Sequence, residues 1–209
     1  MNCDKIDGAT VLAEVCAAVA ADELVAAAAI LREKLPLQPV PRVNGSVPLS
    51  RRIAVFLRDG FICRYSGQRV LLPAAMMLLA KVLPEQFPWH QNWRMDVCHS
   101  AFWELSAEVD HIEPRARRGT HNIDNLVTVT PLVNKSKAHS HLSSLAWSLH
   151  PVGSLHEWDG KAGWFLAEAQ KRPKLLTPMM RETRRLLERM PGTRFTRQPA
   201  IDFDPSASV

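Results

Sequence analysis

Four polar residues in the middle of the chain have the types that metal-assisted hydrolysis of a phosphodiester needs. Asp110 and His111 are adjacent, Asn125 lies 14 residues after His111, and Asn134 follows after another 9. Carboxylate and amide oxygens are hard ligands, which suit Mg²⁺, with Mn²⁺ as a substitute, better than Zn²⁺. An unperturbed histidine is neutral at pH 7 and can accept a proton from water. A bound cation can offset the phosphate charge that repels nucleophiles, while such a base activates water.

The elements that must position these residues are visible in the same stretch. Residues 108–111 predict a strand, and residues 126–129 predict a second one because apolar residues alternate with threonine. Thr130 has the side chain of an N-cap, and Pro131 occupies the first helical position. Asn134 then falls in the first turn of a helix. The expected order is strand, basic loop, strand and helix.

This stretch resembles the HNH nucleases, a family whose core is a ββα-metal unit. The pattern Asp-His-Ile-x-Pro at residues 110–114 is followed by Gly119, by Asn-Leu at 125–126 and by Asn-x-x-Lys at 134–137. The order and spacing of these pieces together are typical of the family. The resemblance covers about residues 51–141.

The resemblance implies a role for each polar residue. Asp110 and Asn134 would bind one divalent metal, Mg²⁺ with Mn²⁺ as a substitute, and His111 would act as the general base. Asn125 would fix the loop that carries His111. The basic residues of the stretch would contact nucleic-acid phosphates, or else form a solvated basic loop: Arg115, Arg117, Arg118, Lys135 and Lys137.

The family's zinc knuckle is mostly lost from this sequence. In the family a helix and Arg-Asp-Gly, here residues 58–60, lead into the first of two cysteine pairs. Cys63 keeps the first position, but Ser66 replaces the second cysteine, and Thr130 and Val133 occupy the second pair. Structural zinc takes four Cys or His ligands. We therefore expect no structural zinc, with apolar packing in its place.

Composition and charge fit a protein that binds a polyanion. The 209 residues are 46% hydrophobic, which is enough for a core, and carry a net charge of +5 with a pI near 9.3. A merely basic protein would show the same charge. The four cysteines form no CxxC pair, which predicts reduced thiols. No uninterrupted apolar span or basic N-terminal leader is visible, so we expect a cytoplasmic protein.

We expect a mainly helical α+β protein in three parts. Residues 1–48 form an N-terminal helical segment, bent near Asp22, with a Pro-rich linker. Residues 49–145 form the HNH core with an inserted loop region, and residues 146–209 form an aromatic-anchored, basic helical C-terminal extension. We expect the N-terminal helices to have one of two roles. They form a contact in a homodimer or with a partner protein, or they form a helix pair packed on the same domain.

The inserted loop region, residues 84–95, is rich in aromatic residues. Phe87, Trp89 and Trp93 occur there among prolines and polar residues. Such side chains either stack on nucleic-acid bases or pin the loop to the body of the domain, and pinning is the more common case.

Two functions from different classes remain. The first is a metal-dependent endonuclease that hydrolyses DNA phosphodiester bonds, with restriction or phage defence as a candidate context and RNA as a second substrate class. The alternative is a non-catalytic DNA-binding or structural module on a degenerate HNH scaffold, which the loss of the zinc cysteines favours. The joint presence of Asp110, His111, Asn125 and Asn134 favours the nuclease, because a module that only binds needs no base.

Overall fold

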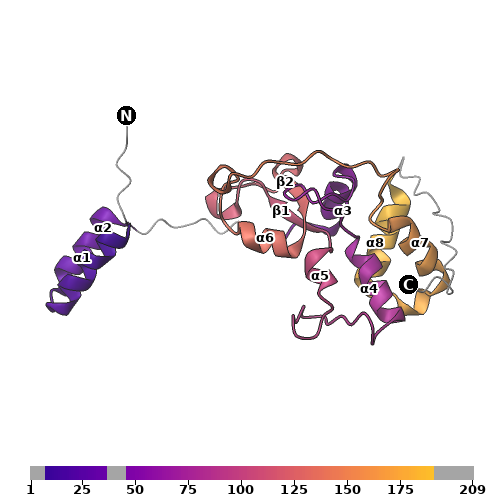
Figure 1. Cartoon of the computed structure of the whole chain (residues 1–209), viewed down its shortest axis with the longest axis horizontal. Coiled ribbons are helices and arrows are strands. Elements are labelled where there is room, and N and C mark those ends of the chain that lie inside the picture. The colour runs from indigo at the N-terminus through magenta and orange to yellow at the C-terminus, as the bar shows by residue number, and fades with distance from the viewer. Residues whose placement is uncertain (1–7, 37–45, 191–209) are drawn as a thin grey trace, which may run out of the picture. The chain divides into compact units, whose positions relative to one another are not determined.

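The computed structural model describes residues 8–36 and 46–190 and shows a mainly helical protein with one small sheet (Figure 1). The chain divides into two compact units, Met1–Pro41 and Arg42–Val209, which are described separately. The expected mainly helical α+β class is confirmed. Among the described residues, none of the helices has the length and apolar character needed to cross a membrane.

The first unit is a pair of helices. Helix α1 (Gly8–Ala20) and helix α2 (Leu24–Lys34) pack against each other, and Lys34 Nζ lies 2.6 Å from Glu14 Oε2. The expected break near Asp22 is confirmed, because this residue has a φ of 60° between the two helices.

The second unit is built on a helical core to which the C-terminal segment contributes. Helices α7 and α8 pack on α3 and α4, and Phe165 of α7 and Met180 of α8 are buried together with Phe56 of α3. Residues 146–190 therefore share one hydrophobic core with the preceding segment. The helices are α3 (Leu49–Arg58), α4 (Pro73–Val82), α5 (Ala101–Glu104), α6 (Pro131–Lys137), α7 (Ala162–Lys171) and α8 (Pro178–Arg189).

The sheet has two antiparallel strands. Strand β1 (Glu108–His111) pairs with strand β2 (Leu126–Val129), with Asp110 opposite Val127. Helix α6 begins directly after β2, where the Thr130 side chain accepts a hydrogen bond from Val133 N at 3.2 Å. Both predicted strands and the predicted N-cap are therefore confirmed.

The outer edge of β2 is covered by the Arg-Asp-Gly turn that follows α3. A sheet of two strands is marginally stable by itself, because its edges leave backbone groups unpaired. Thr128 N donates to Asp59 Oδ2 at 2.7 Å, and Arg64 N donates to Thr128 O at 2.7 Å. Arg58 Nη2 donates to Leu126 O at 2.6 Å. Asp59 is fully buried and also pairs with the guanidinium groups of Arg58 and Arg64, at 2.9 and 3.1 Å.

Packing and backbone hydrogen bonds shape the turn where the family has its first cysteine pair. Cys63 is fully buried, and its N–H donates to Gln68 O at 2.8 Å, while Gly67 N donates to Cys63 O at 2.8 Å. Tyr65 packs on Trp147 with ring centroids 5.8 Å apart. Three of the cysteines, Cys16, Cys63 and Cys98, are free thiols, as expected, and Cys3 lies outside the described residues.

Replacing Asp59 tests whether this buried carboxylate holds the sheet. We expect Asp59→Ala to lower the free energy of unfolding by about 3 kcal/mol or more, because two guanidinium groups and a buried N–H lose their partner. Urea denaturation followed by circular dichroism measures the change.

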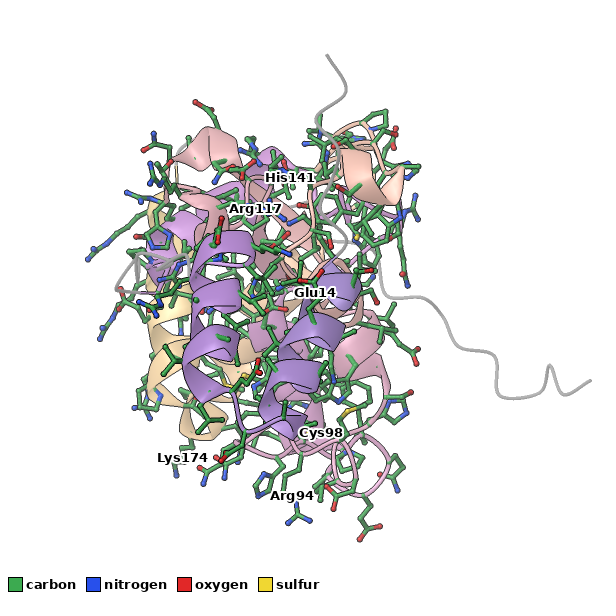
Figure 2. The ribbon with its side chains drawn as sticks, turned by 90° about the vertical axis from the view of Figure 1, so that its left-hand side faces the viewer. Glu14, Arg94, Cys98, Arg117, His141 and Lys174 are labelled. Atoms are coloured by element: carbon green, nitrogen blue, oxygen red, sulfur yellow. The ribbon has the colours of Figure 1, made fainter. Side chains whose placement is uncertain are left out.

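The matched control is Asp96→Ala at the surface. Arg94, labelled in Figure 2, pairs with Asp96, and more than half of each side chain is exposed (57% and 65%). Loss of such an exposed pair changes stability by less than about 1 kcal/mol. Equal losses from the two variants would contradict the role given to Asp59.

Candidate functional site

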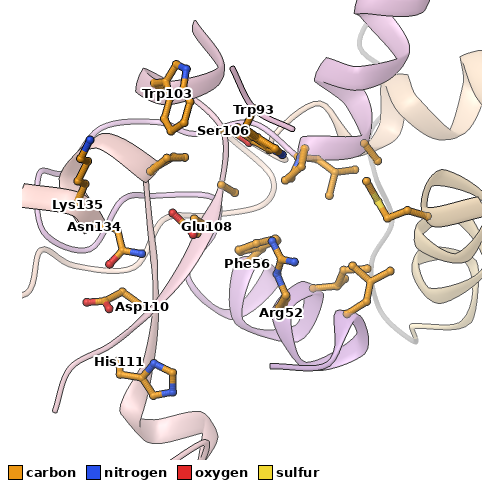
Figure 3. A pocket seen from close by; sticks show the side chains of 18 of the residues that line it. Arg52, Phe56, Trp93, Trp103, Ser106, Glu108, Asp110, His111, Asn134 and Lys135 are labelled. Atoms are coloured by element: carbon orange, nitrogen blue, oxygen red, sulfur yellow. The ribbon is translucent and has the colours of Figure 1, made fainter. Parts of the chain in front are cut away.

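The ends of β1 and α6 meet at a cavity of about 700 Å³. Asp110, His111 and Asn134 all line it, together with Glu108, as Figure 3 shows. Asn134 lies in the first turn of α6, as expected from the N-cap. The structure thus brings three of the four predicted site residues together, whereas Asn125 does not line the cavity.

The Asp110 carboxylate is held by two buried groups. Its Oδ2 lies 2.9 Å from the Tyr65 hydroxyl, which donates to it, and 2.8 Å from Lys137 Nζ. Burial and the Asp110 charge raise the pKa of Tyr65, so the phenol keeps its proton and remains a donor. Lys137 also donates to His111 O at 2.8 Å, which ties the end of α6 to the end of β1.

The position of Lys137 corrects one sequence-based expectation. We expected this residue to contact phosphate, but its side chain is fully buried and forms an ion pair with Asp110. The other basic residues stay accessible: Arg117 and Arg118 are exposed, Lys135 is exposed at the cavity, and Arg115 is a half-buried part of the cavity wall.

His111 is buried beside a second histidine that the sequence did not reveal as part of the site. His111 Nε2 lies 3.0 Å from His121 Nδ1. Burial, followed by the proximity of His121, lowers the pKa of His111 below its usual value of 6.5. The imidazole is therefore neutral at pH 7 and can accept a proton. His121 lies in the basic loop, and nothing in its local pattern indicated that the loop folds back onto β1.

Asn125 ties down the loop that follows His111. Its Oδ1 accepts from Glu113 N at 2.8 Å, and its Nδ2 donates to Thr120 O at 2.9 Å. Its backbone carbonyl accepts from Ile112 N at 2.9 Å. Gly119 lets the loop close, because a Cβ there would overlap the carbonyl of Glu113. These contacts are those of a residue that orients the loop.

Glu108 is a second site residue that sequence reasoning missed. Burial raises the pKa of the Glu108 carboxyl group, and the adjacent Asn134 side chain and the charge of Arg52 oppose this shift. The signal was available, because residues 108 and 110 point to the same face of a strand.

The oxygen atoms of Asp110 and Asn134 fit a hard divalent cation. Both contacts to Asp110 fall on Oδ2, so Oδ1 is the atom left for a metal. Asn134 lines the same cavity and would contribute its side-chain carbonyl oxygen. Mg²⁺ commonly takes one or two protein ligands and keeps water or phosphate oxygens. No group of three or more His, Cys, Asp or Glu residues suited to a metal occurs among residues 8–36 and 46–190.

The middle of the chain matches one protein-family model. The family model described as HNH endonuclease matches residues 96–138, which include β1, β2 and α6. Residues 96–138 are therefore similar to the HNH endonucleases, and the resemblance inferred from the motifs is confirmed. No curated protein and no solved structure matches the chain.

The burial of Lys137 leads to a stability prediction. We expect Lys137→Met to lower the free energy of unfolding by about 3 kcal/mol, because it leaves Asp110 buried without its cation. Lys135→Met, two residues earlier on the same helix and exposed, is the matched control and should leave stability nearly unchanged. Urea denaturation measures both variants. An unchanged stability for Lys137→Met, combined with a weaker salt dependence of DNA binding, would restore the phosphate-contact role.

Proposed function

We propose that this protein is a metal-dependent endonuclease that hydrolyses DNA phosphodiester bonds. The observation that carries the proposal is the meeting of Asp110, His111 and Asn134 at one cavity, inside the segment that the HNH family model matches. One base and two hard oxygen ligands at one cavity are the groups that phosphodiester hydrolysis needs.

His111 is the proposed general base. Its lowered pKa keeps the imidazole neutral near pH 7, so it can take a proton from the attacking water. The contact with His121 and the bond from Lys137 to its backbone carbonyl hold it in place. Asn125 limits the movement of the loop after β1 and so acts as a positioning residue.

Asp110 and Asn134 are the proposed ligands of one Mg²⁺ ion, for which Mn²⁺ would substitute. When bound, the ion would offset the phosphate charge and stabilise the leaving oxygen. Lys137 and Tyr65 fix Asp110 through one carboxylate oxygen, Oδ2, and leave Oδ1 available for the proposed metal ion. Arg115 and Lys135 at the cavity are proposed phosphate contacts, and so are two exposed residues of the same loop: Arg117 and Arg118.

The alternative function is a DNA-binding or structural module without catalysis. The loss of the zinc cysteines favoured it, but the buried Cys63 and the hydrogen-bonded turn at residues 63–68 indicate that packing supports this region. RNA remains a second substrate class, and restriction or phage defence remains the candidate context. A homodimer or partner contact through α1 and α2 stays a prediction.

Replacement of His111 tests the proposal. We expect His111→Ala to slow cleavage of a labelled DNA duplex by roughly 10²–10⁴, because the base is lost while both metal ligands remain. Binding of the duplex, measured in EDTA, should persist. Asp110→Ala and Asn134→Ala should instead weaken the response to metal, and excess Mn²⁺ should partly restore cleavage.

The matched control is His156→Ala, an exposed histidine that does not line the cavity. Its cleavage rate should equal that of the parent. If His111→Ala cleaves as fast as the parent across several metals, the assignment of the base is wrong.

A further inference from the structure

The cavity that contains Asp110 and Asn134 extends well beyond these two residues. Another part of its wall is formed by tryptophans of the inserted loop region and α5, and by apolar side chains of α3 and α4. Figure 3 shows Trp93, Trp103 and Ser106 along this part of the same cavity as Asp110. A phosphate, a metal ion and a water molecule account for the polar end of the cavity. They do not account for an aromatic wall.

Unpaired polar atoms are concentrated at this cavity. In residues 8–36 and 46–190, five buried side-chain nitrogen or oxygen atoms lack a hydrogen-bond partner, and four of the five belong to residues that line the cavity. Three are Trp89 Nε1, Trp103 Nε1 and Ser106 Oγ, and the fourth is Arg115 Nε. Ser106 is only 1% exposed. A buried polar group without a partner destabilises a protein by about 1–3 kcal/mol, so a ligand that offered partners to these groups would be favoured at this wall.

The chemistry of these atoms defines the ligand. An indole N–H only donates a hydrogen bond, and a serine hydroxyl donates or accepts. The ligand must therefore carry acceptors such as carbonyl oxygens or ring nitrogens, and it must have apolar faces that fit between aromatic side chains. Nucleobases have both properties and stack on aromatic residues with little dependence on sequence.

One group of tryptophan contacts has a structural purpose. The Trp93 ring meets Phe102 edge-on at 6.0 Å and Trp103 at 5.7 Å between centroids, which confirms that Trp93 pins the inserted loop region. The indole N–H groups of Trp89 and Trp103 have no hydrogen-bond partner, so the pinning by Trp93 does not account for these donors.

We infer that this part of the cavity binds one nucleobase of the substrate, unstacked from its neighbours, while an adjoining phosphate lies at Asp110. The inference rests on the proposed function, because it places the base next to the proposed site of cleavage. Removing a base from a duplex costs a few kcal/mol, and least where it is mismatched or already unpaired. The protein should therefore prefer DNA that contains an unpaired base over a fully paired duplex.

The test compares two duplexes of the same sequence, one fully paired and one with a single bulged base. Binding is measured by fluorescence anisotropy in EDTA, so that the result does not depend on cleavage. We expect the parent protein to bind the bulged duplex about tenfold more tightly, in line with stacking of one base on an aromatic wall. Ser106→Ala removes only the hydroxyl group, and Trp103→Phe removes the indole N–H and reduces the aromatic surface. Each should lower this preference severalfold without changing the affinity for paired DNA.

Trp164→Phe is the matched control, because Trp164 lies on α7 and outside the cavity lining. It should keep the full preference for the bulged duplex. An equal affinity of the parent for the two duplexes, or an equal loss in Trp164→Phe, would overturn the base-binding inference. A parent that shows the preference but cleaves no DNA with any divalent metal would refute the proposed nuclease instead and leave the base site standing.

Discussion

Asp59 binds Arg58, Arg64 and the backbone N–H of Thr128, and these bonds replace a third strand at the outer edge of β2. The position of β2 determines much of the site. Its pairing with β1 fixes the register of Asp110, and α6 begins at its end and carries Asn134 to the same cavity. One buried carboxylate, far along the chain from the proposed chemistry, thus supports both proposed metal ligands.

A second buried pair, Lys137 with Asp110, sets the electrostatics of the site. Lys137 forms an ion pair with the Asp110 carboxylate and fixes the position of one of its oxygens. The positive charge of Lys137 also weakens the attraction of this carboxylate for a second cation. A cation held by only Asp110 and Asn134 would need further oxygens, which water and the phosphate of the proposed substrate would supply. Such an arrangement would couple metal binding to binding of the nucleic acid.

Local patterns predicted the elements of the site, whereas contacts between distant segments were not predictable from them. The N-cap at Thr130 and the place of Asn134 in the first helical turn follow from residues a few positions apart. The burial of Lys137 depends on how α6 packs on β1, and the contact of His121 with His111 depends on how the basic loop folds back. Glu108 could have been found from strand alternation alone, because it shares a strand face with a predicted ligand.

The most direct test of the central claim is cleavage of supercoiled plasmid DNA by the unaltered protein, in Mg²⁺, in Mn²⁺ and in EDTA. We expect nicked or linear products with either metal and none in EDTA, because the proposed site supplies a base and two ligands but no cation of its own. Absence of cleavage with every divalent metal tested, in a protein that still binds DNA, would contradict the nuclease and favour the binding module. Cleavage that persists in EDTA would contradict the role given to Asp110 and Asn134.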